Sequence, residues 1–155
     1  MAELKVGDKA PFFSGTDSAG ERIALDDFNG KRLILYFYPK DNTSGCTAEA
    51  CSLRDGYGEL RTMGFDVVGV SPDSEHSHSK FTEKFSLPFR LIADTDKKIV
   101  ADYGVWAEKK LYGRTYMGVL RKTFVIDGNG VIEKIFDKVN TKDHFVQIAD
   151  AYKTE

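Results

Sequence analysis

The chain contains a continuous apolar run, Leu33 to Tyr38, which is rich in aromatic side chains and ends at Pro39. A run of this length that stops at a proline predicts a buried strand at the centre of a sheet. The residues after Gly45 favour a helix. The chain is therefore expected to pass from a buried strand, through a short loop, directly into a helix.

Strand-like and helical segments alternate along the rest of the chain, which predicts an α/β fold. The segment 12–25 is expected to form an added N-terminal β-hairpin, and the turn Asp127-Gly128-Asn129-Gly130 should join the last two strands as a hairpin. The other expected strands are 65–70, 90–93, 122–126 and 131–136, and the expected helices are 75–86, 97–103 and 143–152. These elements predict a central mixed sheet flanked by helices.

Cys46 and Cys51 are the only two cysteines, and both follow the loop. Cys46 would begin the helix, where unpaired backbone N–H groups and the positive end of the helix dipole favour a thiolate. Ordinary packing explains Cys46 as well, because it shares a helical face with Ala50 and Leu53 and free cysteines are often buried. Position alone therefore does not establish reactivity.

In an intact helix the Cα atoms of Cys46 and Cys51 would lie about 8.7 Å apart. Disulfides usually join Cα atoms about 4.4 to 6.8 Å apart, so a bond between these cysteines requires the first helical turns to unwind. The spacing leaves two hypotheses open. The cysteines form a transient disulfide after Cys46 is oxidised, or they are two unreactive buried thiols.

The segment from Tyr36 to Cys51 reads YFYPKDNTSGCTAEAC and resembles the active-site segment of the peroxiredoxins. The second cysteine, five residues after the first, is similar to the pattern of the bacterioferritin comigratory protein, or PrxQ, subfamily. Gly104–Trp106, Gly113–Gly118 and Arg121–Asp127 extend the resemblance, in family order, over nearly the whole chain. Ser44 is a departure, because the family usually has proline there. Serine makes the loop less rigid, although it could cap the helix instead.

The resemblance implies a thioredoxin-like fold and a thiol peroxidase that needs no metal, haem or flavin cofactor. Cys46 would reduce hydrogen peroxide or an organic hydroperoxide and become a sulfenic acid, and Cys51 would then close an intramolecular disulfide. Thioredoxin, or a glutaredoxin, would reset the enzyme. The family's active-site threonine and arginine correspond to Thr43 and Arg121, and Pro39 would shape the loop and shield the sulfur.

The chemistry also requires groups other than the cysteine. A thiol with a pKa of about 8.5 is about 3% ionised at pH 7, so complete ionisation gains only about thirtyfold. Enzymes commonly need about 10⁶-fold or more, so other groups must orient and polarise the peroxide. Thr43 offers a hydroxyl and Arg121 a permanent cation. Without the resemblance, Arg54, Arg114 and Lys122 would be comparable candidates for the cation.

The remaining polar candidates are expected to be surface residues. Glu49 lies three residues after Cys46, but solvent exposure explains it as well as a role at the helix start, and it is left outside the catalytic set. His76, His78 and His144 form no recognisable four-ligand zinc pattern with the cysteines, so they are expected on the surface and no metal is expected.

Length and charge fit one enzyme-sized domain over residues 1–155. The formal net charge is −2, with 22 basic and 24 acidic residues, and gives no reason to expect a nucleic acid or a membrane as partner. The sequence shows neither a secretory signal nor a stretch of transmembrane length, which predicts a cytoplasmic protein. A monomer is expected, because an intramolecular disulfide needs no second subunit and no large exposed apolar stripe is evident.

Two other functions stay open at this point. A thiol-disulfide exchange protein would use the same fold, but such proteins typically carry a Cys-x-x-Cys motif, which is absent here. A non-enzymatic binding protein would keep both cysteines as inert packing, since a fold alone does not give a function. Rapid reaction of Cys46 with peroxide would distinguish the peroxidase from both.

Overall fold

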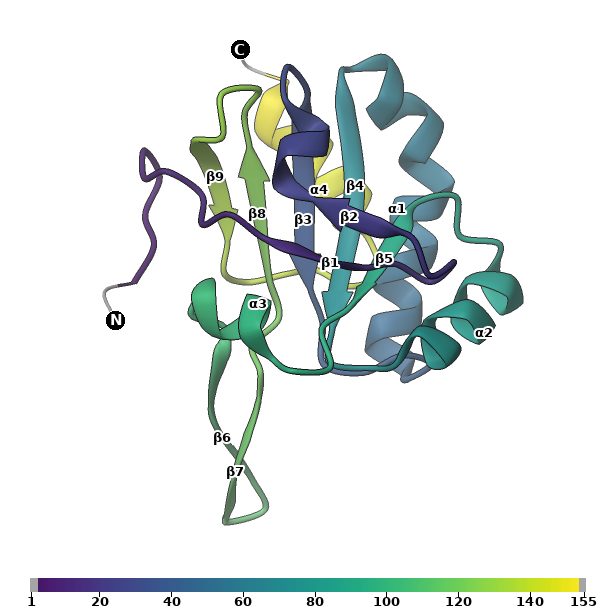
Figure 1. Cartoon of the computed structure of the whole chain (residues 1–155), viewed down its shortest axis with the longest axis vertical. Coiled ribbons are helices and arrows are strands. Elements are labelled where there is room, and N and C mark those ends of the chain that lie inside the picture. The colour runs from purple at the N-terminus through teal and green to yellow at the C-terminus, as the bar shows by residue number, and fades with distance from the viewer. Residues whose placement is uncertain (1–2, 154–155) are drawn as a thin grey trace.

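The computed structural model describes residues 3–153 and contains a five-stranded sheet (Figure 1). Its strands lie in the order β5 (Arg90–Ala93), β4 (Phe65–Ser71), β3 (Arg32–Phe37), β8 (Lys122–Ile126) and β9 (Ile132–Phe136). The first three are parallel, whereas β8 is antiparallel to β3 and β9 to β8. The predicted central mixed sheet is confirmed, and the apolar run lies on its middle strand.

The side chains of β3 point alternately into two hydrophobic clusters, one on each face of the sheet. Leu33 and Phe37 belong to the first cluster, and Ile34 and Tyr36 belong to the second. A strand that is covered on both faces must be apolar at successive positions, because neighbouring side chains point to opposite faces. This double burial explains why the run from Leu33 onward has no polar interruption.

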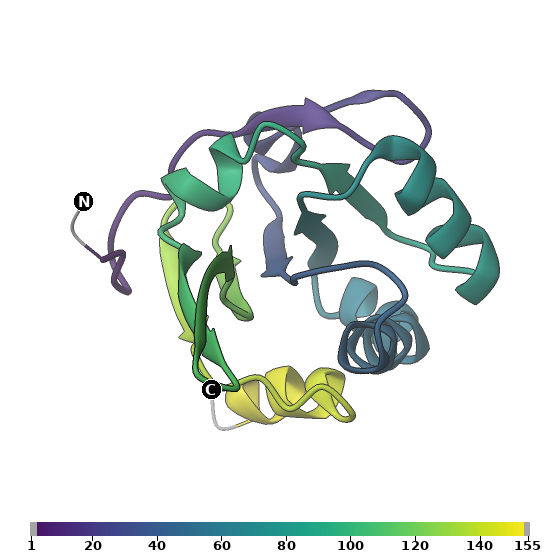
Figure 2. The same cartoon turned by 90° about the horizontal axis from the view of Figure 1, so that it is seen from below.

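Helices cover both faces of the sheet (Figure 2). α1 (Ser44–Thr62) and α4 (His144–Tyr152) lie on one face, and α3 (Lys98–Asp102) and the 3-10 helix η1 (Leu25–Phe28) lie on the other, while α2 (Glu75–Phe85) packs beside the β5 edge. The expected helices 75–86, 97–103 and 143–152 are confirmed to within one residue at each end. Among residues 3–153, no helix combines the length and the apolar character needed to span a membrane.

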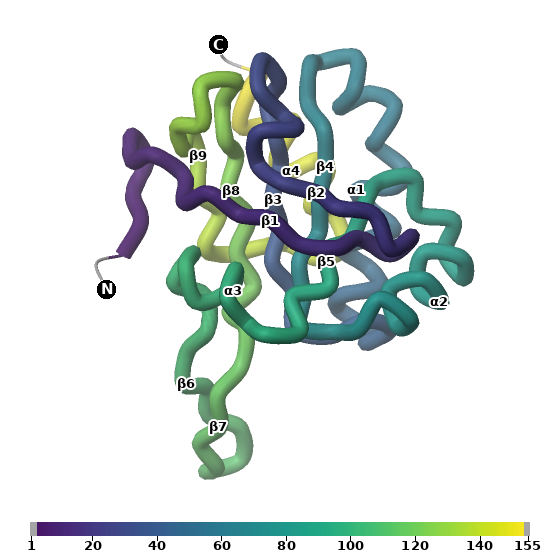
Figure 3. The backbone as a smooth tube through the Cα atoms, in the orientation of Figure 1, coloured from purple at the N-terminus to yellow at the C-terminus, as the bar shows by residue number. Residues whose placement is uncertain are grey.

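The expected N-terminal hairpin is also confirmed. β1 (Ser14–Thr16) pairs antiparallel with β2 (Arg22–Ala24). The chain before and through β1 crosses the sheet from the β9 side to the β5 edge, as the tube in Figure 3 shows, and isolated bridges from Lys9 to Val131 and from Asp17 to Ile92 mark the two ends of this path. This crossing covers the face of the sheet that α1 and α4 leave open.

One further hairpin was not expected from the sequence. β6 (Trp106–Leu111) pairs antiparallel with β7 (Arg114–Val119) and projects beyond the end of the sheet at which the β3–α1 loop lies (Figure 1). Most of its side chains are exposed, including Tyr112 at 95%, so it lacks the apolar run that identified the other strands. Tyr112 and Gly113 both have positive φ angles, 52° and 77°, and form the two-residue turn for which Gly113 was the available signal.

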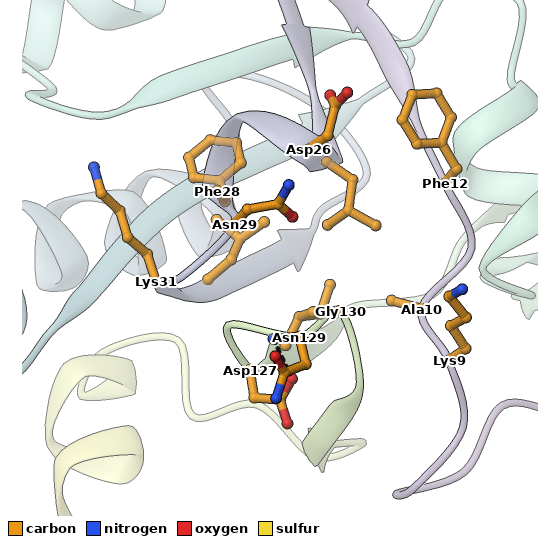
Figure 4. A pocket seen from close by; sticks show the side chains of 13 residues that line it. Lys9, Ala10, Phe12, Asp26, Phe28, Asn29, Lys31, Asp127, Asn129 and Gly130 are labelled. Carbon is orange, nitrogen blue, oxygen red and sulfur yellow. Dashed lines mark hydrogen bonds between the residues drawn. The ribbon is translucent and has the colours of Figure 1, made fainter.

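A cavity of about 440 Å³ lies at the opposite end of the sheet (Figure 4). Leu33 and Ile126 line it, close to the start of β3 and the end of β8, together with Phe12, Phe28 and Lys31. The two cysteines follow the other end of β3. This cavity is therefore separate from the cysteine site.

Candidate active site

The end of β3 and the start of α1 place Cys46 inside the protein, beyond the end of the middle strand of the sheet. Cys46 is 1% exposed and is the third residue of α1. Thr43 is the N-cap, and its carbonyl accepts from the backbone N–H of Thr47 at 2.8 Å. The sulfur therefore lies in the first helical turn, at the positive end of the helix dipole, which stabilises negative charge there. Ser44 is the first helical residue rather than the cap, so the capping role considered for it is wrong.

Arg121 is the cation that reaches the sulfur. Lys122 pairs with Phe37 at the end of β3, so Arg121 lies just beyond that strand, beside the loop that leads to Cys46. Its Nη2 donates to Cys46 Sγ at 3.2 Å, and its Nη1 donates to Glu49 Oε1 at 2.6 Å. One guanidinium therefore links the cysteine to a carboxylate one turn further along α1.

The alternative cations lie elsewhere. Arg54 donates to the Phe85 carbonyl, Lys122 forms ion pairs with Glu3 and Asp137, and Arg114 is exposed on β7. Burial opposes the charged form of Arg121, but Glu49 and Cys46 outweigh it and raise the pKa of the guanidinium. Arg121 therefore stays positively charged at any working pH.

Glu49 belongs to the site, although its position in the sequence was equally compatible with a solvent-exposed side chain. Its side chain is 0% exposed, because it lies on the same buried face of α1 as Cys46. Burial raises the pKa of Glu49 to about 7, although the Arg121 guanidinium acts in the opposite direction. Among the described residues, its second oxygen Oε2 has no hydrogen-bond partner.

His144 lies behind Glu49, and its expected surface position is wrong. The imidazole is fully buried, with Nε2 3.7 Å from Glu49 Oε2. Gln147 uses its amide nitrogen on the Lys138 carbonyl, so its Oε1 accepts from His144 Nδ1 at 2.9 Å. His144 Nε2 then carries the lone pair that accepts from Thr123 Oγ1 at 2.8 Å. Burial lowers the pKa of His144 to about 4, which agrees with this neutral form.

His78 is the second correction, because it is also fully buried, whereas His76 is exposed as expected. The Nδ1 atom of His78 lies 2.7 Å from Asp41 Oδ2, in the loop between β3 and α1. Polar residue types are usually exposed, so only the packing of α2 against the sheet could reveal this burial.

The other predicted site residues surround the loop. Thr43 donates its hydroxyl hydrogen to the Lys40 carbonyl at 3.0 Å, which leaves the oxygen lone pairs able to accept from a bound peroxide. Pro39 is half-buried where β3 ends. Both remain predicted site residues, placed by the structure in the segment between the strand and Cys46.

Cys51 is half-buried in α1, and both cysteines are free thiols. α1 continues without a break from Ser44 to Thr62. A bond between Cys46 and Cys51 therefore requires the start of this helix to open, as the helical geometry predicted.

A buried cysteine at a helix start, held by an arginine beside a five-stranded mixed sheet, defines the class of thiol-based peroxidases with a thioredoxin-like fold. Comparisons with known proteins agree. The model of the AhpC/TSA family matches residues 6–135, and the chain belongs to this family. Peroxiredoxin Bcp of Escherichia coli K12 is 47% identical over 144 residues, which cover 93% of this chain and 92% of that protein.

Solved structures give the same result. A PrxQ variant from Xylella fastidiosa superposes with a TM-score of 0.92 at 28% identity and covers 99% of this chain and 98% of its own. The bacterioferritin comigratory protein of Xanthomonas campestris, described for its alkyl peroxide reduction activity, has a TM-score of 0.86 at 30% identity over 95% of this chain and 98% of its own. The protein is a thiol-dependent peroxidase.

Proposed function

We propose that Cys46 is the sulfur that attacks the peroxide and that Arg121 stabilises the charges of this step. The contact of Arg121 with both Cys46 Sγ and Glu49 Oε1 is the observation that carries the assignment. A fixed guanidinium stabilises the thiolate before reaction and the negative charge that develops on the leaving oxygen. Glu49 holds the guanidinium in place.

In the first step the Cys46 thiolate attacks the terminal oxygen of ROOH. The S–O bond forms as the O–O bond breaks, the sulfur is oxidised to a sulfenic acid, and the leaving RO⁻ takes up a proton to become ROH. Thr43 orients the peroxide through its hydroxyl, and Pro39 shields the sulfur from water. The leaving oxygen takes the proton of the peroxide, which leaves the sulfur as a sulfenate, and the sulfenate takes up a proton from the medium to become the sulfenic acid.

In the second step the Cys51 thiolate attacks the sulfur of the Cys46 sulfenic acid. The disulfide forms, and the departing hydroxide leaves as water with a proton from the medium. α1 must unwind at its start for the sulfurs to meet. The half-buried position of Cys51 supports this role, because a resolving thiol needs some freedom to move.

The family implies a peroxide substrate and a thiol reductant, and we assign thioredoxin as the reductant, with a glutaredoxin as the alternative. Hydrogen peroxide and organic hydroperoxides are the proposed substrates, the latter supported by the alkyl peroxide reduction described for the Xanthomonas campestris relative. We also propose that the protein acts as a monomer, because a bond within one chain needs no second subunit, and that it acts in the cytoplasm, as its sequence predicts.

Stopped-flow consumption of one equivalent of hydrogen peroxide tests the assignment. Wild type and Cys51→Ser should consume the equivalent rapidly, whereas Cys46→Ser should not. Peptide mass mapping should find a 46–51 disulfide in the oxidised wild type and a sulfenic acid at Cys46 in Cys51→Ser. Slow, identical traces for all three proteins would refute the assignment of Cys46.

A further inference from the structure

The loop that leads to Cys46 is tied to its surroundings through the side chain of Asp41. This carboxylate is 3% exposed. Its Oδ1 accepts from the Tyr38 hydroxyl at 2.6 Å, and its Oδ2 accepts from the Ser77 hydroxyl at 2.7 Å and lies 2.7 Å from His78 Nδ1. The backbone N–H of the same residue donates to Asp73 Oδ2 at 2.8 Å. Asp41 thus joins the loop to α2 and to the segment that follows β4.

The hydrogen bonds of His78 require a proton between its Nδ1 atom and Asp41 Oδ2. His78 Nε2 lies 2.9 Å from the Ile92 carbonyl, and a carbonyl can only accept, so Nε2 carries a hydrogen. A neutral imidazole has one N–H, which would leave the Nδ1 lone pair facing Asp41 Oδ2. Both groups are buried, where opposed lone pairs are costly. One proton must therefore lie between Nδ1 and Oδ2, either on His78 or on Asp41.

We propose that Asp41 and His78 form a hydrogen-bonded latch, which holds the loop before Cys46 and sets how readily the start of α1 opens for disulfide formation. Asp41 and His78 are positioning residues in this scheme, since neither touches the sulfur. The latch rests on the proposed Cys46–Cys51 cycle. Its role is to favour the folded arrangement that reacts with peroxide over the opened arrangement that forms the disulfide.

The short distance along the chain from the latch to the sulfur supports this coupling. α1 begins at Ser44, so only Asn42 and Thr43 separate the latched residue from the helix that must unwind. Asn42 has a left-handed φ of 62°, and its side chain accepts from Lys84 Nζ at 3.2 Å. Opening of the helix start must therefore displace a loop that is held by hydrogen bonds to Tyr38, to Asp73 and to α2.

Other titratable groups lie around the pair. They are Tyr36 from β3, Tyr38 from the loop that follows it, Asp73 from the segment after β4, and Lys80 and Lys84 from α2. Burial raises the pKa of both tyrosines well above the ordinary value, so they stay neutral. β5 contributes the Ile92 carbonyl, which does not titrate.

The first test separates the two chemical steps in single-turnover experiments with hydrogen peroxide. In His78→Asn the shorter side chain cannot join Asp41 to Ile92. Disulfide formation should then become about tenfold faster, the change expected for loss of one buried charged hydrogen bond, while the peroxide reaction slows or stays unchanged. His76→Asn, on the exposed side of the same helix, should match wild type in both steps. An unchanged or slower rate of disulfide formation in His78→Asn would overturn the latch.

The second test uses a variant that keeps the contact. In Asp41→Asn the amide can donate to the Nδ1 lone pair of a neutral His78, so the contact between the loop and α2 survives. The rate of disulfide formation in Asp41→Asn should therefore stay closer to the wild-type rate than the rate in His78→Asn does. Disulfide formation that is about tenfold faster in Asp41→Asn than in wild type would overturn the proposal, even where His78→Asn fails to fold.

The same measurements distinguish the latch from the cycle on which it rests. If oxidised wild type forms no bond between Cys46 and Cys51, the proposed cycle fails and the latch fails with it. If the bond forms at equal rates in wild type and His78→Asn, the cycle stands and the latch alone is wrong.

Discussion

Two buried groups behind the reactive cysteine should make opposite contributions to the pH dependence of stability. The folded protein raises the pKa of Glu49 from 4.5 to about 7 and lowers the pKa of His144 from 6.5 to about 4, in both cases because burial disfavours the charged form. Glu49 therefore holds its proton more tightly when folded, and His144 holds its proton less tightly. The variants Glu49→Gln and His144→Gln remove one contribution each.

The size of each effect follows from these values. At about 1.4 kcal/mol for each pKa unit, each difference corresponds to about 3 kcal/mol in the free energy of unfolding. For Glu49 the stability is present below about pH 4.5 and is lost as the pH rises to about 7. For His144 the sign is reversed, and stability is gained as the pH rises from about 4 to about 6.5. The two slopes nearly cancel in wild type.

Urea unfolding at a series of pH values measures this balance. The stability of Glu49→Gln should rise by about 3 kcal/mol across the acidic range, because the His144 contribution is no longer opposed. His144→Gln should lose a similar amount between about pH 4.5 and about pH 7. The exposed residues Glu59 and His76 provide matched controls, and Glu59→Gln and His76→Asn should follow wild type.

Parallel curves for wild type, Glu49→Gln and His144→Gln would refute the reasoning, since burial would then not perturb either group. Slopes of the opposite sign would show that the Arg121 ion pair outweighs the burial of Glu49. In that case Glu49 would be ionised throughout the range.

Further predictions concern the cation and the helix packing. Arg121→Ala should slow the reaction with peroxide by about 10² to 10³-fold in stopped flow, because one donor to the developing charge is lost. Lys122→Ala, one residue away, should react within about threefold of the wild-type rate. Equal losses of rate in both variants would contradict the role of Arg121. A Cβ on Gly56 would lie 2.1 Å from the Phe145 ring, whereas one on Gly58 meets nothing within 4 Å. In urea unfolding, Gly56→Ala should therefore destabilise by about 2 kcal/mol and Gly58→Ala should stabilise by about 0.5 to 1 kcal/mol; similar values for both would refute the close packing of α1 and α4.

The local sequence pattern was sufficient to predict the strands of the five-stranded sheet. Two covered faces make β3 apolar at successive positions, and the Asp127–Gly130 turn leaves few alternatives to a hairpin between β8 and β9. The β6–β7 hairpin could not be found in this way, because its strands are largely exposed and carry no apolar run. The expectation that residues 1–155 form one domain stays a prediction.

Site residues divide in a similar way. The motif around Cys46 indicated the reactive sulfur, and the resemblance selected Arg121 from several cations that the residue types alone could not separate. Glu49, His78 and His144 were expected on the surface or judged equally compatible with it, because charged and polar side chains are exposed in most positions. Their burial is the feature that the sequence pattern could not reveal.

Apolar periodicity and turn residues depend on neighbours along the chain. They therefore specified the strands of the five-stranded sheet, most helices and a cysteine at a helix start without reference to the rest of the protein. The antiparallel pairing of β3 with β8 brings Arg121 to Cys46 across 75 positions of sequence. The packing of α4 and α2 encloses Glu49, His144 and His78. Only the tertiary structure decided these pairings, because the energy of a buried charge depends on which distant groups surround it and exclude water.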